Sequence, residues 1–116
     1  MQKDDPLQID MQDGSSAGTR IFRLTGPITL PNLFAFQNAM RGGESPRAAI
    51  LDLTAVPFMD SAGMGAVINY FTHCQRNNIR MLVVGVSDRV RELFKMTGVD
   101  TVIPMLETMA EAESRV

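Results

Sequence analysis

The sequence has few of the residues on which catalytic and metal sites usually depend. It contains one cysteine, Cys74, which excludes an internal disulfide, and one histidine, His73, which excludes a histidine-rich metal site. No apolar run approaches the roughly 18 residues that span a membrane. Residues 1–5 (MQKDD) lack the apolar core of a signal peptide, so no membrane insertion is expected and the predicted location is cytoplasmic.

Charge and motif spacing exclude further classes of protein. The formal net charge of −2 argues against a nucleic-acid or anionic-membrane surface as the main partner. The acidic residues are scattered without metal-ligand spacing, and residues 63–65 (GMG) match no phosphate-binding loop. His73 is predicted to lie about three helical turns beyond Ser61, too far to act as its base. Cys74 has no basic cluster near it and is predicted to be a buried apolar residue. We therefore predict no catalytic residue and no metal site.

The sequence does contain a regular alternation of strand and helix patterns. We expect strands over residues 7–11, 19–25, 48–53, 80–86 and 101–103. Helices are expected around residues 33–40, from Ser61 to about Asn77, over 88–97 and from Thr108. The order is β-β-α-β-α-β-α-β-α, which indicates an α/β fold with a mixed, mostly parallel sheet of about five strands and four helices. At 116 residues, the chain is predicted to be a single domain, 1–116, with an ordered core of about 7–112.

The stretch from residue 56 to 65 (VPFMDSAGMG) joins a predicted buried strand to a predicted helix. Such a junction presents free backbone N–H groups and a partial positive charge. Ser61 is therefore either part of a helix cap or a site where a negative group can be placed, and residue type alone favours the cap. Gly63 and Gly65 each cost about 1 kcal/mol in a helix, so their pairing predicts a close contact with this turn.

For three further residues of this region, residue type alone allows more than one role. Met59 and Met64 bracket the turn and are either core residues, which is favoured, or part of an adaptable contact surface. Thr29, before the first predicted helix, is a possible cap for it.

Four segments together resemble the STAS domain family. Residues 58–65 (FMDSAGMG) resemble its D-S-[ST]-G-[LM]-G signature and are most similar to the signature of bacterial anti-sigma factor antagonists. The other three segments are 22–26 (FRLTG), similar to the second strand and its glycine, 50–53 (ILDL), similar to the strand before the signature, and 90–98 (VRELFKMTG), similar to R-L-F-x-[MI]-[ST]-G. The likeness covers roughly residues 7–112, in the element order predicted above.

The resemblance implies a STAS fold and a binding module that is not an enzyme. In such antagonists the unphosphorylated protein binds an anti-sigma factor, which is also a serine kinase, and so frees the sigma factor. The resemblance implies that this kinase phosphorylates Ser61, which breaks the complex, and that a phosphatase acting on phospho-Ser61 restores it. ATP belongs to the kinase, so no cofactor is implied for this chain. The implied partner-binding surface comprises Thr29, Met59, Asp60, Ser61, Ala62, Gly63 and Met64, with the exposed side of the following helix.

The chain departs from the family pattern at three positions. Ala62 replaces the second hydroxyl residue of the signature, which leaves Ser61 as the only hydroxyl in the turn. Thr29 stands where the family usually has aspartate, and Pro27 stands in place of another acid, so the negative charge is lost there. The resemblance also allows two other functions: a STAS subunit, never phosphorylated, of a signalling scaffold or a membrane lipid or anion transporter, and a nucleotide-binding domain. The missing phosphate loop disfavours the second of these.

Overall fold

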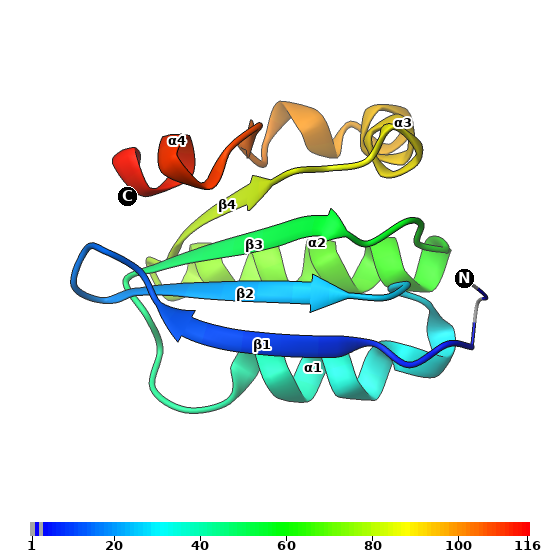
Figure 1. Cartoon of the computed structure of the whole chain (residues 1–116), viewed down its shortest axis with the longest axis horizontal. Helices are drawn as coiled ribbons and strands as arrows, with labels where there is room; N and C mark the ends of the chain where they lie inside the picture. The colour runs from blue at the N-terminus through cyan, green and yellow to red at the C-terminus, as the bar shows by residue number, and fades with distance from the viewer. Residues whose placement is uncertain (1, 3) are drawn as a thin grey trace.

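A computed structural model describes residue 2 and residues 4–116, and it shows a five-stranded sheet flanked by helices (Figure 1). Met1 and Lys3 lie outside the described residues. Both belong to the predicted domain range and to the segment predicted not to be a signal peptide. The strands are β1 (Gln8–Asp13), β2 (Thr19–Thr25), β3 (Ala48–Ala55), β4 (Arg80–Val84) and β5 (Met105–Leu106). The α-helices are α1 (Leu33–Arg41), α2 (Ser61–Arg76), α3 (Asp88–Thr97) and α4 (Met109–Ser114), and η1 (Leu30–Asn32) and η2 (Val99–Thr101) are 3-10 turns.

The strands lie in the order β1-β2-β3-β4-β5, so neighbours in the sheet are also neighbours in the sequence. β1 pairs antiparallel with β2, and the other pairings are parallel, as the hairpin and the strand–helix alternation predict. The mixed α/β fold, the element order and the mostly parallel sheet are therefore confirmed.

The sheet has a different core on each face. The main core lies between the sheet and α1, α2 and α3, and it includes Phe22, Phe36, Val67 and Phe94. Figure 1 shows α1 and α2 running together behind the sheet. On the other face a smaller core is covered by α4; its buried residues are Ile21, Ile50, Leu82, Val84, Leu106 and Ala112. The apolar parts of β3 (48–51) and β4 (81–84) are thus buried on both faces, which explains these continuous apolar runs.

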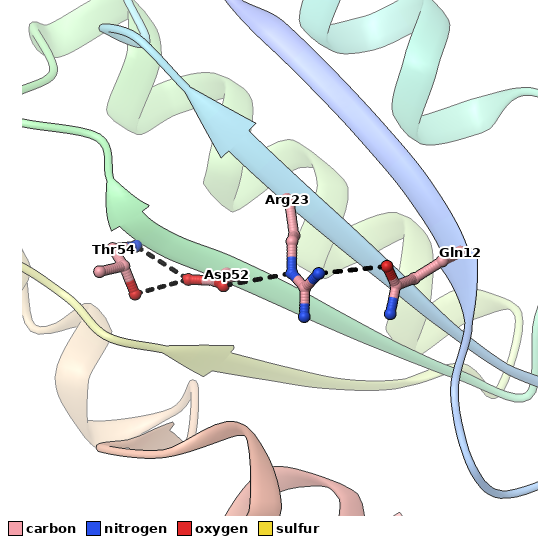
Figure 2. Close-up of polar contacts among 4 residues, drawn as sticks. All are labelled: Gln12, Arg23, Asp52 and Thr54. Carbon is pink, nitrogen blue, oxygen red and sulfur yellow. Dashed lines mark hydrogen bonds and ion pairs between the residues drawn. The ribbon is translucent and has the colours of Figure 1, made fainter.

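A polar row occupies the part of the second face beside this smaller core (Figure 2). The Arg23 guanidinium lies 3.7 Å from a carboxylate oxygen of Asp52 and donates a 3.2 Å hydrogen bond to the Gln12 side chain. The other Asp52 oxygen accepts hydrogen bonds from the backbone N–H and the hydroxyl of Thr54, at 3.0 and 2.6 Å. The row therefore joins β1, β2 and β3 on a surface that α4 leaves open to water.

Four predicted strands differ from the structure: besides the two described next, β3 ends two residues later than the predicted range of 48–53, and β4 ends two residues earlier than the predicted range of 80–86. The strand predicted over residues 101–103 is wrong: the chain forms η2 there, and the last strand is Met105–Leu106. Gly98 ends α3 with a φ of +75°, and the turn that follows buries Ile103 in the main core without strand pairing. β1 begins and ends later than the predicted range of 7–11. β2 and the two ends of α2 are as predicted.

Candidate functional site

The candidate site is built where two loops continue the parallel pairing of β2 and β3 beyond the strands. The Ile28 N–H donates to the Phe58 carbonyl, and the Asp60 N–H donates to the Ile28 carbonyl, each at 3.3 Å. Ile28 and Met59 form a parallel bridge, and both side chains are buried. The turn before Ser61 is therefore fixed by backbone hydrogen bonds to the loop that precedes α1.

The Asp60 carboxylate caps the starts of two helices at once. One oxygen accepts a 2.8 Å hydrogen bond from the Gly63 N–H in the first turn of α2. The other accepts a 3.1 Å hydrogen bond from the Leu30 N–H, the first residue of η1, which leads into α1. Both N–H groups would otherwise lack helical partners, and each helix start carries partial positive charge. Asp60 therefore holds the two helix starts together.

The prediction that Thr29 caps the first helix is wrong. Its side chain makes no capping hydrogen bond; it is fully buried, and its hydroxyl accepts a 3.4 Å contact from the Asn32 side chain. The same Asn32 amide donates to the carbonyls of Asp5 and Pro27, each at 2.9 Å. Thr29 thus faces inward to a small buried polar cluster, and the capping role falls to Asp60, which is distant in sequence.

The two glycines of the α2 start have opposite environments. A Cβ on Gly63 would lie 1.8 Å from the Ile28 carbonyl oxygen, so only glycine allows the loop to approach this turn. A Cβ on Gly65 would meet nothing within 4 Å. The predicted close contact is confirmed at Gly63 and wrong at Gly65, which lies on the exposed side of α2.

The predicted site residues divide by exposure. Ser61, the first residue of α2, is exposed, and Asp60 and Ala62 on either side of it are half-buried. The others are buried: Thr29, Met59, Gly63 and Met64. The core packing favoured for Met59 and Met64 is confirmed. In this conformation the buried residues shape the turn, while the atoms available to another molecule come from residues 60–62.

Sequence reasoning missed two exposed apolar residues, one in η1 and one in α1. Phe34 is 78% exposed and Leu30 is 61% exposed, although both belong to the segment that Asp60 ties to α2. Leu33, Phe36 and Met40 carry the helical repeat of α1, and Phe34 falls outside it. An apolar residue out of phase with the buried stripe was the signal that could have found it.

A second polar group lies farther along α2, in the core. The Tyr70 ring packs edge-on against Phe22 and stacks on the half-buried His73 ring, with centroids 6.2 and 5.9 Å apart. Cys74 is fully buried, as predicted, and burial raises the pKa of its thiol. Burial, with the nearby Cys74, also raises the pKa of the Tyr70 phenol. Both groups are therefore uncharged at neutral pH.

Within residues 2 and 4–116, no three His, Cys, Asp or Glu side chains are grouped to hold a metal ion. In the same part of the chain, no helix is both long and apolar enough to cross a bilayer.

A mixed five-stranded sheet with α-helices in the order β-β-α-β-α-β-α-β-α places this protein in the α/β class. The STAS domain family model matches residues 9–112, and the chain belongs to the STAS domain family. It is 33% identical over 61 residues to an anti-sigma-B factor antagonist of Listeria monocytogenes; the match spans 53% of this chain and 54% of that protein. The alignment thus reaches about half the length of this curated relative.

Two solved structures are similar in fold. One is an anti-sigma factor antagonist from Mycobacterium paratuberculosis, with a TM-score of 0.81, 22% identity, and coverage of 97% of this chain and 95% of that chain. The other is a sulfate transporter family protein from Wolinella succinogenes, with a TM-score of 0.76, 22% identity, and coverage of 84% of each chain. These similarities establish the fold, which signalling and transporter proteins share.

Proposed function

We propose that this protein is an anti-sigma factor antagonist whose binding to an anti-sigma factor is switched by phosphorylation of Ser61. The observation that carries the proposal is the placement of Ser61: exposed, on the first turn of α2, beside a turn held rigid by Asp60 and Gly63. The names of the relatives support an anti-sigma factor as the partner. In this proposal the chain binds and releases a partner that is also a serine kinase, and catalyses nothing itself.

A phosphate on Ser61 would change the surface without disrupting the fold. It adds about −1.5 to −2 charges at a helix N-terminus, where the partial positive charge of the helix favours an anion. The exposed residues Leu30, Phe34, Gly65 and Ile68 of the joined helix segments are uncharged, and the half-buried Asp60 carboxylate already accepts two backbone hydrogen bonds. A partner shaped to this uncharged surface would have to bury the new charge, so the complex would dissociate.

The proposed docking surface consists of Leu30, Phe34, Ser61, Gly65 and Ile68. On α2, Ser61, Gly65 and Ile68 follow the i, i+4, i+7 spacing of one helix face. Leu30 joins this face through its hydrogen bond to Asp60, and Phe34 lies one turn farther along. Phe34 supplies a large, rigid apolar group of the kind that dominates binding energy at interfaces.

The phosphorylation test uses the whole chain, ATP and a candidate anti-sigma serine kinase, with intact-mass spectrometry as the readout. We expect the mass of one phosphate to be added to the wild type and to Ser45→Ala, which removes another exposed serine, and not to Ser61→Ala. Ser61→Ala should keep its affinity for the kinase in the presence of ATP. No phosphate on Ser61 with any such kinase would overturn the switch and favour the subunit of a scaffold or transporter.

The binding test compares two exposed apolar residues. We expect Phe34→Ser to weaken binding to the anti-sigma factor by about 2 kcal/mol, and Val102→Ser, in the segment after α3, to leave it unchanged. Ser61→Asp should fold as the wild type does and fail to bind. Calorimetry with the purified partner gives all three affinities, and a Ser61→Asp variant that binds normally would refute the role of charge.

A further inference from the structure

β1 forms a free edge of the sheet. It is the outermost strand, and among the described residues only β2 pairs with it (Figure 1). Five of its six residues are exposed, and Ile9 is half-buried. The strand at the opposite edge, β5, is only two residues long. β1 is therefore the longer of the two edges that the sheet presents to another molecule.

This edge lacks several features by which sheets usually block further pairing. Proline, lysine and β-bulges are common protections of an edge strand. β1 (QIDMQD) contains no proline, glycine or lysine, and its six pairs with β2 continue without a register shift. Its two charges, Asp10 and Asp13, lie opposite Arg23 and Arg20 of β2 in the ladder. The backbone of β1 is thus regular enough to pair with a further strand.

The hydrogen bonds of the hairpin show which backbone groups of β1 point outward. The Gly14 N–H donates to the Thr19 carbonyl at 2.8 Å, one pair beyond the end of the ladder. Such bonded positions alternate in an antiparallel pair, so every second residue of β1 directs its backbone groups to β2. The N–H and C=O groups that face the other way are those of Ile9, Met11 and Asp13.

A pocket of about 320 Å³ adjoins this edge, on the side of the sheet that carries α1. Its lining residues come from the end of β1, the start of β2 and the loop after α1: Met11, Gln12, Asp13, Arg20, Gly42 and Gly43. Met11 is 52% exposed there, although its partner in the ladder, Phe22, is fully buried. Alternate side chains of an added strand would point to the same side. The edge therefore offers unpaired backbone groups and an apolar side chain together.

We propose that the outer edge of β1 pairs with β1 of a second copy of this chain, antiparallel and with Met11 opposite Met11. In this two-fold arrangement the outward groups of Ile9 face those of Asp13 in the second copy, and those of Met11 face their own equivalents. The two Met11 side chains then cover each other beside the pockets. One continuous sheet runs through both copies.

The charges of β1 favour this register and a partner of the same sequence. Asp10 lies opposite Gln12 of the second copy, so no two aspartates face each other. A register shift of two residues in one direction would place Asp10 opposite Asp10, where like charges are destabilising. A shift of two residues in the other direction would move Ile9 opposite Ser15, in the turn after β1. The register centred on Met11 is therefore the one that pairs most of the edge without opposing charges.

The dimer should be weak and independent of the phosphorylation switch. A ladder of six residues buries less surface than a standard interface, so we expect a dissociation constant of about 0.1 to 1 mM. No residue of this ladder belongs to the proposed docking surface around Ser61. Ser61→Asp should therefore form the dimer as the wild type does.

Sedimentation equilibrium of the whole chain, from about 10 µM to about 2 mM, tests the proposal. We expect the mean mass to rise from that of a monomer toward that of a dimer. Hydrogen exchange of the Met11 amide should slow over the same concentration range, because that N–H gains a carbonyl partner. A chain that stays monomeric throughout this range overturns the proposal.

Three variants at the centre of the ladder locate the interface. Met11→Pro removes an outward N–H, so it should abolish the dimer and keep the pairing with β2. Met11→Lys places two like charges opposite each other and should raise the dissociation constant more than about tenfold. Met96→Lys, at a residue of α3 that is 76% exposed, should leave it unchanged.

The third variant tests the register. Met11→Cys should form a disulfide between two copies under mild oxidation, because facing residues of an antiparallel ladder lie within disulfide reach. Gln8→Cys, at the other end of β1, should not, since the two Gln8 positions lie far apart in this register. A dimer that Met11→Pro and Met11→Lys leave intact uses another surface and overturns the proposal, as does equal cross-linking of the two cysteine variants.

Discussion

Alanine at Gly63 and alanine at Gly65 should have opposite effects on stability, although the two positions are one residue apart in the same helix. In an unconstrained helix, each change from glycine to alanine stabilises by about 1 kcal/mol. At Gly65 the new methyl group meets nothing within 4 Å, so the propensity gain should be realised. For a domain of this size it corresponds to a rise in Tm of about 4 °C.

At Gly63 the added Cβ would lie 1.8 Å from the Ile28 carbonyl oxygen, where real contacts do not fall below 3.0 Å. The loop must move by more than an ångström, which breaks the hydrogen bond from the Asp60 N–H and strains the one from the Ile28 N–H. Two backbone hydrogen bonds contribute about 1 kcal/mol each, and overpacking adds about 1 to 3 kcal/mol. After the propensity gain, we expect Gly63→Ala to destabilise by about 2 to 4 kcal/mol.

Urea denaturation of both variants and the wild type, followed by circular dichroism, measures the difference. The midpoint should fall for Gly63→Ala and rise for Gly65→Ala, with similar slopes, because neither change alters the surface exposed on unfolding. Equal destabilisation of the two variants would refute the reasoning, since it would mean that helix position and not the Ile28 contact sets the cost. Gly65→Ala should also bind the anti-sigma factor more weakly, because its methyl group projects from the proposed docking surface.

Three further predictions concern other contacts. Asp60→Asn should lower stability by about 2 kcal/mol in urea denaturation and speed hydrogen exchange of the Leu30 amide. The asparagine side chain has one oxygen, so at one of the two helix starts its NH₂ group would face a backbone N–H that needs an acceptor. Unchanged exchange would contradict the shared cap. Thr108→Ala should cost about 1 kcal/mol in the same assay, since it removes the N-cap of α4, and an unchanged midpoint would count against that cap. Burial raises the pKa values of the Cys74 thiol and the Tyr70 phenol, so the unfolded chain loses these protons at a lower pH than the folded chain. The free energy of unfolding should therefore fall as the pH rises above about 8.5, and Cys74→Ser should make that fall less steep. A pH dependence of stability that Cys74→Ser does not change would contradict the assignment.

The sequence was sufficient where local patterns and tertiary packing agree. The alternation in residues 19–25 specified β2, and the strand-to-helix junction placed the start of α2 correctly. The last strand failed because the β-branched residues 101–103 favour a strand by propensity, whereas the αL conformation of Gly98 directs the chain into a turn. The two-residue strand that does form is too short for any periodic signal.

The candidate site was predictable only in part, for a similar physical reason. Ser61 is prominent in the sequence because it lies at a junction with glycines and an aspartate. The second hydrogen bond of Asp60 is not visible there, since its partner Leu30 is thirty residues earlier and is brought close by the pairing of two loops. The burial of Thr29, next to Ile28 in the paired loop, follows from the same pairing.

The polar row on the open face of the sheet affects the register in which β2 and β3 pair. Arg23 and Asp52 are opposite each other in the parallel ladder, and the register shifts directly after them, between Arg23 and Thr25. A slip of one residue would turn Arg23 into the core and bring its neighbours Phe22 and Leu24 to water. A half-exposed ion pair adds little to the free energy of unfolding. Its larger effect is on register, because a shifted pairing of β2 and β3 would separate the charges of Arg23 and Asp52.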